Sequence, residues 1–435
     1  LSPDTFYLFL LSRTGGHYRW LIAIMGTTLQ LVLGTVYAWS FFQKPIMSAY
    51  GWNNVQVMWI FSIAICFLGI GATIGGMNLA KFGPRKLATA GAVMWGVGWI
   101  VGAIAMSMKS LPLFYIGYGV IGGLGLGLGY VTPVATAAKW FPDKKGFITG
   151  MVVMGFGLGA LLMSKILAPI IMDVTQNDLV TAFMYIGVAL LVLGIPAGLI
   201  MKNPPAGFVP EGYTPPVQSS ANKASEDKLC AKDCFKSSKF IRMWIIFFLN
   251  ISAGIMFIGL QSPMMQDLLK KGGSTLDTAG LAAAGATLIA ISSLFNGVGR
   301  FFWGGLSDKI GRIQAFRLIL GTQIIVFVSL MYVSNPWIFG AMVCYVLLCY
   351  GGGFGTMPSF VGDIFTAKLM PVVYGVILTA WSIGGIVGPQ IAAFIKDNYA
   401  ENAATYTFIA GAIMLALGVA IAFTLNNKSL ADEKA

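Results

Sequence analysis

Charged residues are scarce in this chain of 435 residues: Asp, Glu, Lys and Arg make up 10% of it, against 57% hydrophobic residues. Soluble globular domains carry about 25% charged residues. The mean hydropathy of +0.79 is strongly apolar. The composition therefore excludes a soluble globular protein and predicts a protein with many membrane-spanning segments.

Histidine and cysteine are also rare, with one histidine and five cysteines. Cys66, Cys344 and Cys349 lie in apolar stretches, so we expect reduced thiols rather than a disulfide framework. The other pair, Cys230 and Cys234, forms a C-x3-C motif far from the histidine, which is a poor zinc site. We predict no metal and no cofactor.

Catalytic groups are missing from the apolar stretches as well. No predicted span combines a nucleophile with a base, so we predict that the protein is not an enzyme. A membrane receptor would need a sizeable soluble signalling domain, and the sequence offers only a short polar segment in its middle.

Long apolar stretches dominate what is present. Each is long enough to cross a hydrocarbon core of about 30 Å as a helix. The sequence therefore predicts an all-α membrane protein with twelve transmembrane helices, near residues 20–41, 55–80, 87–107, 112–138, 147–171, 179–201, 241–262, 278–306, 314–333, 337–362, 371–395 and 404–425.

Basic residues set the predicted topology. With the N-terminus in the cytoplasm, 21 Lys and Arg fall in inner segments and six in outer segments, which is a strong positive-inside asymmetry. We therefore expect both termini in the cytoplasm and a multi-pass protein of the cell (inner) membrane. The same distribution explains the net charge of +12 without a nucleic-acid partner.

The chain divides into two similar halves. Residues 202–239 are rich in proline, serine and lysine and predict a cytoplasmic linker between six-helix bundles at 1–201 and 240–435. Glycines and prolines recur between the halves at an offset of 225 residues, as in Pro133 with Pro358 and Gly150 with Gly375. In transporters with such repeats the substrate site lies at the interface between the halves.

Arg300 is the only strongly basic residue well inside a predicted span. It lies roughly 12 Å along the helix from Asp308, and a lipid-facing arginine at this depth would cost about 2 to 3 kcal/mol. Asn296 and Ser293 share its helical face. Arg300 is either a structural cation paired with a carboxylate of another helix or a binding site for an anionic substrate. The scarcity of Asp and Glu inside the spans favours the substrate.

Two loop motifs resemble those of the major facilitator superfamily, which has a G-x3-D-x2-G-x-[RK] loop after helices 2 and 8. The second copy contains Asp308 and Arg312. The first copy has Ala80 at the acidic position and keeps the turn with Arg85 and Lys86. The resemblance implies two pseudo-symmetric six-helix bundles and a gate on the cytoplasmic side. We place Asp308, Arg312, Arg85 and Lys86 at this gate, together with Asp363 near the inner end of helix 10.

The segment Lys139-Trp-Phe-Pro-Asp-Lys-Lys-Gly146 and the run from Asn296 to Arg312 are similar to the oxalate/formate antiporter branch of that superfamily. The related monocarboxylate transporters share the arginine of helix 8. In this family that arginine pairs with the substrate carboxylate, so the resemblance implies the same role for Arg300, with Asn296 as a further donor or as a structural contact between helices.

Further candidates for the binding site come from the other helices. Trp381 takes the place where the resemblance puts a second cation in oxalate carriers, so we expect one cation for one negative charge, although Trp381 can also be a packing residue. The remaining candidates, each with a packing role as its alternative, are Gln30, Tyr37, Tyr130 and Asn250.

Together these features predict a monomeric secondary active transporter of small monocarboxylates such as lactate, pyruvate or acetate, with a proton as co-substrate. The alternative is a carboxylate exchanger of the oxalate/formate antiporter type. A drug or cation exporter of the same superfamily would be expected to contain buried carboxylates instead of a lone arginine.

Overall fold

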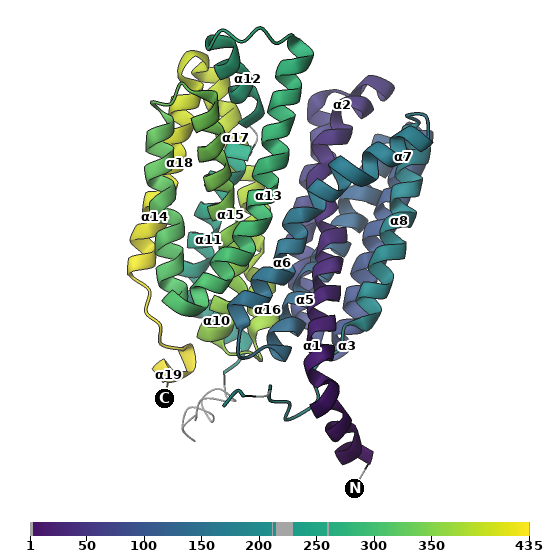
Figure 1. The fold of residues 1–435 in the computed structure, drawn as a ribbon, viewed down its shortest axis with the longest axis vertical. Coiled ribbons are helices and arrows are strands. Elements are labelled where there is room, and N and C mark those ends of the chain that lie inside the picture. The colour runs from purple at the N-terminus through teal and green to yellow at the C-terminus, as the bar shows by residue number, and fades with distance from the viewer. Residues whose placement is uncertain (1–2, 211, 215–228, 259–260, 435) are drawn as a thin grey trace.

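The computed structural model describes residues 3–210, 212–214, 229–258 and 261–434, and within them the chain is helical, with no strand. Residues 211 and 215–228 of the predicted linker lie outside the described residues. Two bundles stand side by side, and α1 begins at the same end of the molecule at which α19 ends (Figure 1). We call this end the terminal face.

The first bundle contains the helices up to α8. Its elements are α1 (Pro3–Gly34), η1 (Thr35–Ala38), α2 (Trp39–Tyr50), α3 (Asn54–Ser107), α4 (Leu111–Phe114), η2 (Tyr115–Gly122), α5 (Gly123–Trp140), α6 (Lys145–Leu162), η3 (Met163–Leu167), α7 (Ala168–Val174) and α8 (Leu179–Ile200). Helix α3 packs against α5 and α8, and α1 packs against α5, α6 and α8.

The second bundle begins after the linker. Its elements are α10 (Ala231–Lys236), α11 (Ser238–Ile258), α12 (Gln261–Lys271), α13 (Thr278–Ile310), α14 (Arg312–Leu330), α15 (Pro336–Phe365), α16 (Met370–Ile377), α17 (Thr379–Asn398), η4 (Ala400–Asn402), α18 (Ala403–Phe423) and α19 (Leu430–Lys434). Helix α11 packs against α17 and α18, and α13 packs against α15.

The predicted twelve crossings are confirmed in the described residues. Ten segments have the length and hydropathy of a span. One of them, Val55–Ser107, contains two crossings, because Gly83 breaks it with φ 76°, ψ 163°, and α13 supplies the remaining crossing. Gly311 has nearly the same backbone, with φ 88°, ψ 151°, between α13 and α14. A positive φ of this kind favours glycine, and the matching turns support the internal repeat.

Several helices extend beyond their predicted ends. The first crossing bends at η1 and continues as α2 to Tyr50, and α12 prolongs the seventh crossing as a helix. Helix α12 was missed because its sequence includes Asp267, Lys270 and Lys271, so hydropathy alone ends the predicted span before them.

Close backbone contacts join the bundles. Helix α6 packs against α13 and α15 of the other bundle, and α3 packs against α16 and α17. Glycine permits this approach: a Cβ atom added at Gly150 of α6 or at Gly355 of α15 would overlap the carbonyl oxygen of Arg300 on α13. Arg300 is therefore held where three helices meet.

We expect Gly355→Val to destabilise the protein by about 1 to 3 kcal/mol, because the new side chain must push α15 away from α13. Thermal unfolding of the purified protein measures the effect. Gly321→Val is the matched control, since a Cβ at Gly321 meets no atom within 4 Å. Equal unfolding midpoints for the two variants would contradict this account of the helix contact.

Candidate functional site

The guanidinium of Arg300 is fully buried at the junction of α13, α6 and α15. Its Nε donates to Asn296 Oδ1 at 3.3 Å, one helical turn earlier, and its Nη1 donates to the Val153 carbonyl of α6 at 3.4 Å. Its Nη2 has no hydrogen-bond partner. Arg300 and Asn296 thus act together, as their spacing predicts.

No carboxylate of the described residues forms an ion pair with Arg300. Its charge is stabilised by aromatic ring faces, since the guanidinium carbon lies 4.7 Å from the centre of the Phe354 ring and 5.5 Å from that of Phe156. A buried cation with a free donor can accept an anion.

Aromatic residues of both bundles enclose this cation. Trp381 of α17 is fully buried, and its ring lies 5.5 Å from Phe156 and 4.7 Å from Phe354. Tyr37 lies 5.9 Å from Trp381, and Tyr130 lies 5.6 Å from it. The structure therefore brings together five of the predicted residues, which are Arg300, Asn296, Tyr37, Tyr130 and Trp381. We call the side chains of Arg300, Tyr37, Tyr130, Trp381 and the two phenylalanines the aromatic cage.

Hydroxyl groups in and around the cage lack hydrogen-bond partners. The hydroxyls of Tyr37 and Tyr130 are buried and lie close enough to Arg300 for an electrostatic interaction with its charge. Two further tyrosines, Tyr350 of α15 and Tyr374 of α16, bring their hydroxyls near those of Tyr37 and Tyr130, without the geometry of a hydrogen bond. These groups can donate to the oxygens of a small ligand.

Sequence reasoning missed Tyr350, Tyr374 and the two phenylalanines. They lie in apolar or glycine-rich runs where an aromatic residue is ordinary packing, and only the packing of α15 and α16 against α5 and α6 gives them a place beside Arg300. The glycines that follow Tyr350 are the one local signal, since they allow a close approach of helices.

Two of the predicted residues lie differently. The Gln30 amide donates to the Tyr130 carbonyl at 2.8 Å, so it positions α5, while its own Oε1 stays without a partner. Asn250 of α11 accepts a hydrogen bond of 3.1 Å from Gln323 of α14, within the second bundle. The buried Nδ2 of Asn250 has no hydrogen-bond partner.

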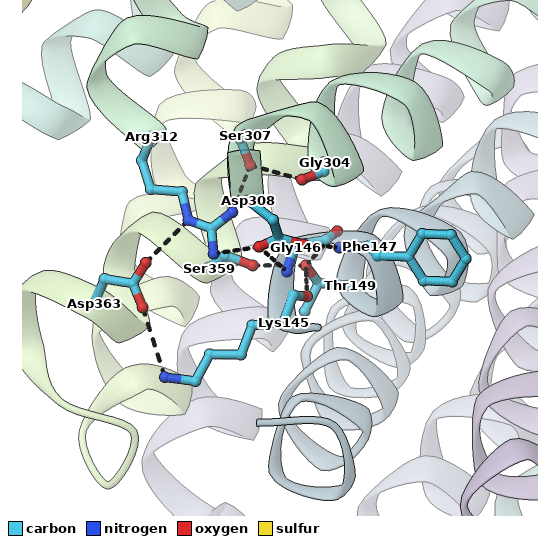
Figure 2. Close-up of polar contacts among 10 residues, drawn as sticks. All are labelled: Lys145, Gly146, Phe147, Thr149, Gly304, Ser307, Asp308, Arg312, Ser359 and Asp363. Atoms are coloured by element: carbon cyan, nitrogen blue, oxygen red, sulfur yellow. Dashed lines mark hydrogen bonds and ion pairs between the residues drawn. The ribbon is translucent and has the colours of Figure 1, made fainter. Parts of the chain in front are cut away.

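A second charged cluster joins the bundles at the terminal face (Figure 2). Asp308 accepts hydrogen bonds from the backbone N–H groups of Gly146 and Phe147, at 2.9 and 2.8 Å, in the first turn of α6. A carboxylate at a helix N-terminus satisfies its free N–H groups and interacts favourably with the helix dipole. Asp308 therefore clamps α13 to α6 across the boundary between the bundles.

Arg312 and Asp363 extend this cluster. Arg312 pairs with Asp308 at 2.7 Å and with Asp363 at 2.9 Å, and Lys145 of the first bundle lies 3.6 Å from Asp363. Nearby, the buried hydroxyls of Thr149 and Ser359 share a hydrogen bond of 2.8 Å between α6 and α15. The terminal face is thus closed by polar contacts between the bundles.

Arg85 and Lys86 do not join this cluster. Both are exposed after the turn at Gly83 and take part in no ion pair of the described residues. The physical reason is Ala80, which offers no carboxylate to hold a basic side chain at the boundary. Among the described residues only the second copy of the motif makes the charged contact, as the alanine at position 80 implies, and the place of Arg85 and Lys86 at the gate stays a prediction.

Groups that would support other chemistry are not found. The described residues contain no cluster of three or more His, Cys, Asp or Glu that could hold a metal ion. Cys230 donates to Asp233 at 3.0 Å rather than joining Cys234 in a ligand set. The arrangement around Arg300 can bind an anion but offers no nucleophile and base.

Comparison with known proteins gives the same family as the motifs. The chain is 27% identical to the oxalate:formate antiporter of Oxalobacter formigenes, over 89% of this chain and 87% of the relative. It is 25% identical to apicoplast pyruvate carrier 1 of Toxoplasma gondii (84% and 73%) and 22% identical to monocarboxylate transporter 13 of Bos taurus (94% and 90%).

Among solved structures, the proton:xylose symporter XylE shares the fold, with a TM-score of 0.68 and 13% identity over 96% of this chain and 99% of that one. The family model described as "Major Facilitator Superfamily" matches residues 19–389. With its two bundles, twelve crossings and charged clamp at Asp308, the chain belongs to the Major Facilitator Superfamily and is a multi-pass membrane transporter, not an enzyme.

Proposed function

We propose that this transporter carries small monocarboxylates, such as lactate, pyruvate or acetate, by alternating access around Arg300. The observation that carries the proposal is the fully buried guanidinium that has a free Nη2 donor and no carboxylate partner among the described residues. A planar guanidinium binds a carboxylate through two parallel hydrogen bonds. The substrate carboxylate would supply the negative charge that pairs with Arg300.

The surroundings of Arg300 favour a substrate with one negative charge and a small apolar tail. The other buried basic residue described, Lys239, pairs with Glu433 at 2.8 Å, far along the chain from the site. Trp381 and the phenylalanines would form an apolar wall for a methyl group, and the tyrosine hydroxyls would hold the carboxylate. Two relatives are named for pyruvate and for monocarboxylates, which supports the same substrate class.

A carboxylate exchanger is the second candidate, because another relative is an oxalate:formate antiporter. Proton symport and exchange differ in the return step. A symporter would return with an empty site after the proton has left with the substrate, whereas an exchanger would return with a second carboxylate bound to Arg300. A drug or cation exporter fits less well, since the buried site holds a cation and aromatic rings rather than a carboxylate.

We further propose that the terminal face lies in the cytoplasm, as the distribution of basic residues predicts, and that the protein works as a monomer in the cell membrane. The cluster of Asp308, Arg312, Asp363 and Lys145 would then be the cytoplasmic gate. Its closure would leave access to Arg300 from outside, and its opening would release substrate to the cytoplasm.

Arg300→Ala should lower carboxylate uptake on the order of a hundredfold or more, because the substrate charge would lose its buried partner. Uptake of radiolabelled L-lactate into proteoliposomes at external pH 6 and pH 8 is the measurement. Uptake that is faster at pH 6 supports symport, whereas pH-insensitive uptake that needs an internal carboxylate supports exchange. Arg317→Gln, at the periphery over Phe423, is the control, and full activity in Arg300→Ala would exclude the site.

Tyr37→Phe and Tyr130→Phe should each raise the KM for lactate roughly tenfold, because a hydrogen bond to a charged group is worth about 1.5 to 3 kcal/mol. Tyr118→Phe is a close control: Tyr118 is also buried with a hydroxyl that lacks a partner, but it packs among Trp39, Trp95 and Trp99. Equal effects at all three positions would show that the hydroxyls act on stability rather than on substrate.

Asp308→Ala should open the terminal face, because two charge-assisted hydrogen bonds to α6 are lost, and shift the closed-to-open ratio on the order of tenfold or more. The distance between spin labels at positions 144 and 368, in a background without native cysteines, reports the opening. Asp277→Ala removes a carboxylate that caps its own helix, α13, through Gly280. That control should leave the distance unchanged, and an unchanged distance in Asp308→Ala would refute the clamp.

A further inference from the structure

A small cavity lies between the bundles at the terminal face, away from the aromatic cage. Its volume is about 30 Å³, enough for a water molecule or two. Lys139 and Lys145 line it from the first bundle, and Ser359 and Met370 line it from the second. Two lysines thus line a space between the bundles.

Lys139 takes no part in the ion pairs of the proposed gate. Its Nζ donates to the neutral Asn203 Oδ1 at 3.2 Å, and it takes part in no ion pair of the described residues. Asp143, four residues later, pairs with Arg19 at 3.3 Å instead. Lys139 is therefore a half-buried cation without a counter-ion.

Lys145 is only loosely neutralised. Its distance of 3.6 Å from Asp363 is longer than the 2.9 Å between Arg312 and Asp363, so Arg312 is the closer partner of this carboxylate. Lys139 and Lys145 are the charged residues that line the cavity, and no carboxylate is among its lining residues. The cavity therefore attracts an anion.

Helices α6 and α15 connect the lining of the cavity with the surroundings of Arg300. Lys145 precedes Val153, the carbonyl partner of Arg300, by eight residues of α6, which is about 12 Å. Between them, the Thr149–Ser359 hydrogen bond joins the bundles, and Ser359 itself lines the cavity. An anion that leaves Arg300 past this hydrogen bond meets the two lysines next.

We propose that Lys139 and Lys145 form a second carboxylate site, which the transported anion occupies between Arg300 and the solvent at the terminal face. The proposal rests on the proposed function, because its ligand is the small carboxylate bound by Arg300. Asp363 holds Lys145 while the gate is closed. When the bundles part, the substrate carboxylate replaces that partner and is drawn toward the exit.

The test uses proteoliposomes with the protein in one orientation and L-lactate on both sides. The concentration of lactate at the terminal-face side that half-saturates trans-stimulated uptake is compared with the half-saturating concentration at the opposite side. Lys139→Gln should raise the first value about three- to tenfold and leave the second within twofold. Lys139→Arg keeps the charge and should keep both values.

Lys144→Gln is the matched control, since Lys144 is exposed beside the same loop and does not line the cavity. Ala367→Asp is a second variant, because Ala367 is an exposed residue that lines the cavity. This substitution adds a negative charge to the cavity while both lysines are kept. It should raise the half-saturating lactate concentration at the terminal-face side. If Lys139→Gln fails to fold, Ala367→Asp still tests the second site.

Three outcomes would overturn the second site: no change in Lys139→Gln and Ala367→Asp, an equal change at both sides of the membrane, or the same change in Lys144→Gln. In each of these cases wild-type transport is intact and the proposed function stands. A wild-type protein that moves no carboxylate overturns the proposed function, and the second site falls with it.

Discussion

The rest of the structure depends on one buried charge, that of Arg300, which has no carboxylate partner among the described residues. Removing a guanidinium from water costs several kcal/mol unless other groups replace its hydration. The chain supplies the Asn296 side chain, the Val153 carbonyl and the ring faces of Phe156 and Phe354. Because these partners come from α13, α6 and α15, the cation ties both bundles together, and the glycines at 150 and 355 are needed to bring the helices near it.

Much of the fold could be predicted from the sequence, because apolar length and the placement of basic residues act locally. The twelve crossings and the pairing of Asn296 with Arg300 follow from such local patterns. The ends of α2 and α12 do not, since these helices continue past the apolar run that marks a span. Their stability comes from contacts with neighbours that hydropathy does not record.

The site was predicted less completely, for a similar reason. Arg300 stands out against its own helix, and Asp308 stands out within its motif. Tyr350 and Tyr374, however, differ from packing residues only through their distance from Arg300, which depends on how five helices meet. Arg85 and Lys86 stay a prediction, because a motif position alone does not bring a basic side chain to a boundary where Ala80 stands in place of the acidic partner.

The replacement of that acid has a mechanical consequence. On one side of the boundary between the bundles, Asp308 of α13 accepts hydrogen bonds from the first turn of α6. On the other side, α3 and α16 meet through the Thr73 hydroxyl, 3.2 Å from the Gly375 carbonyl, and through bare glycine at position 76, with no ion pair among the described residues. The two seams therefore differ in kind. The α3–α16 contacts can part without breaking an ion pair, whereas opening at the α6–α13 seam must separate Asp308 from the first turn of α6 and Asp363 from Lys145.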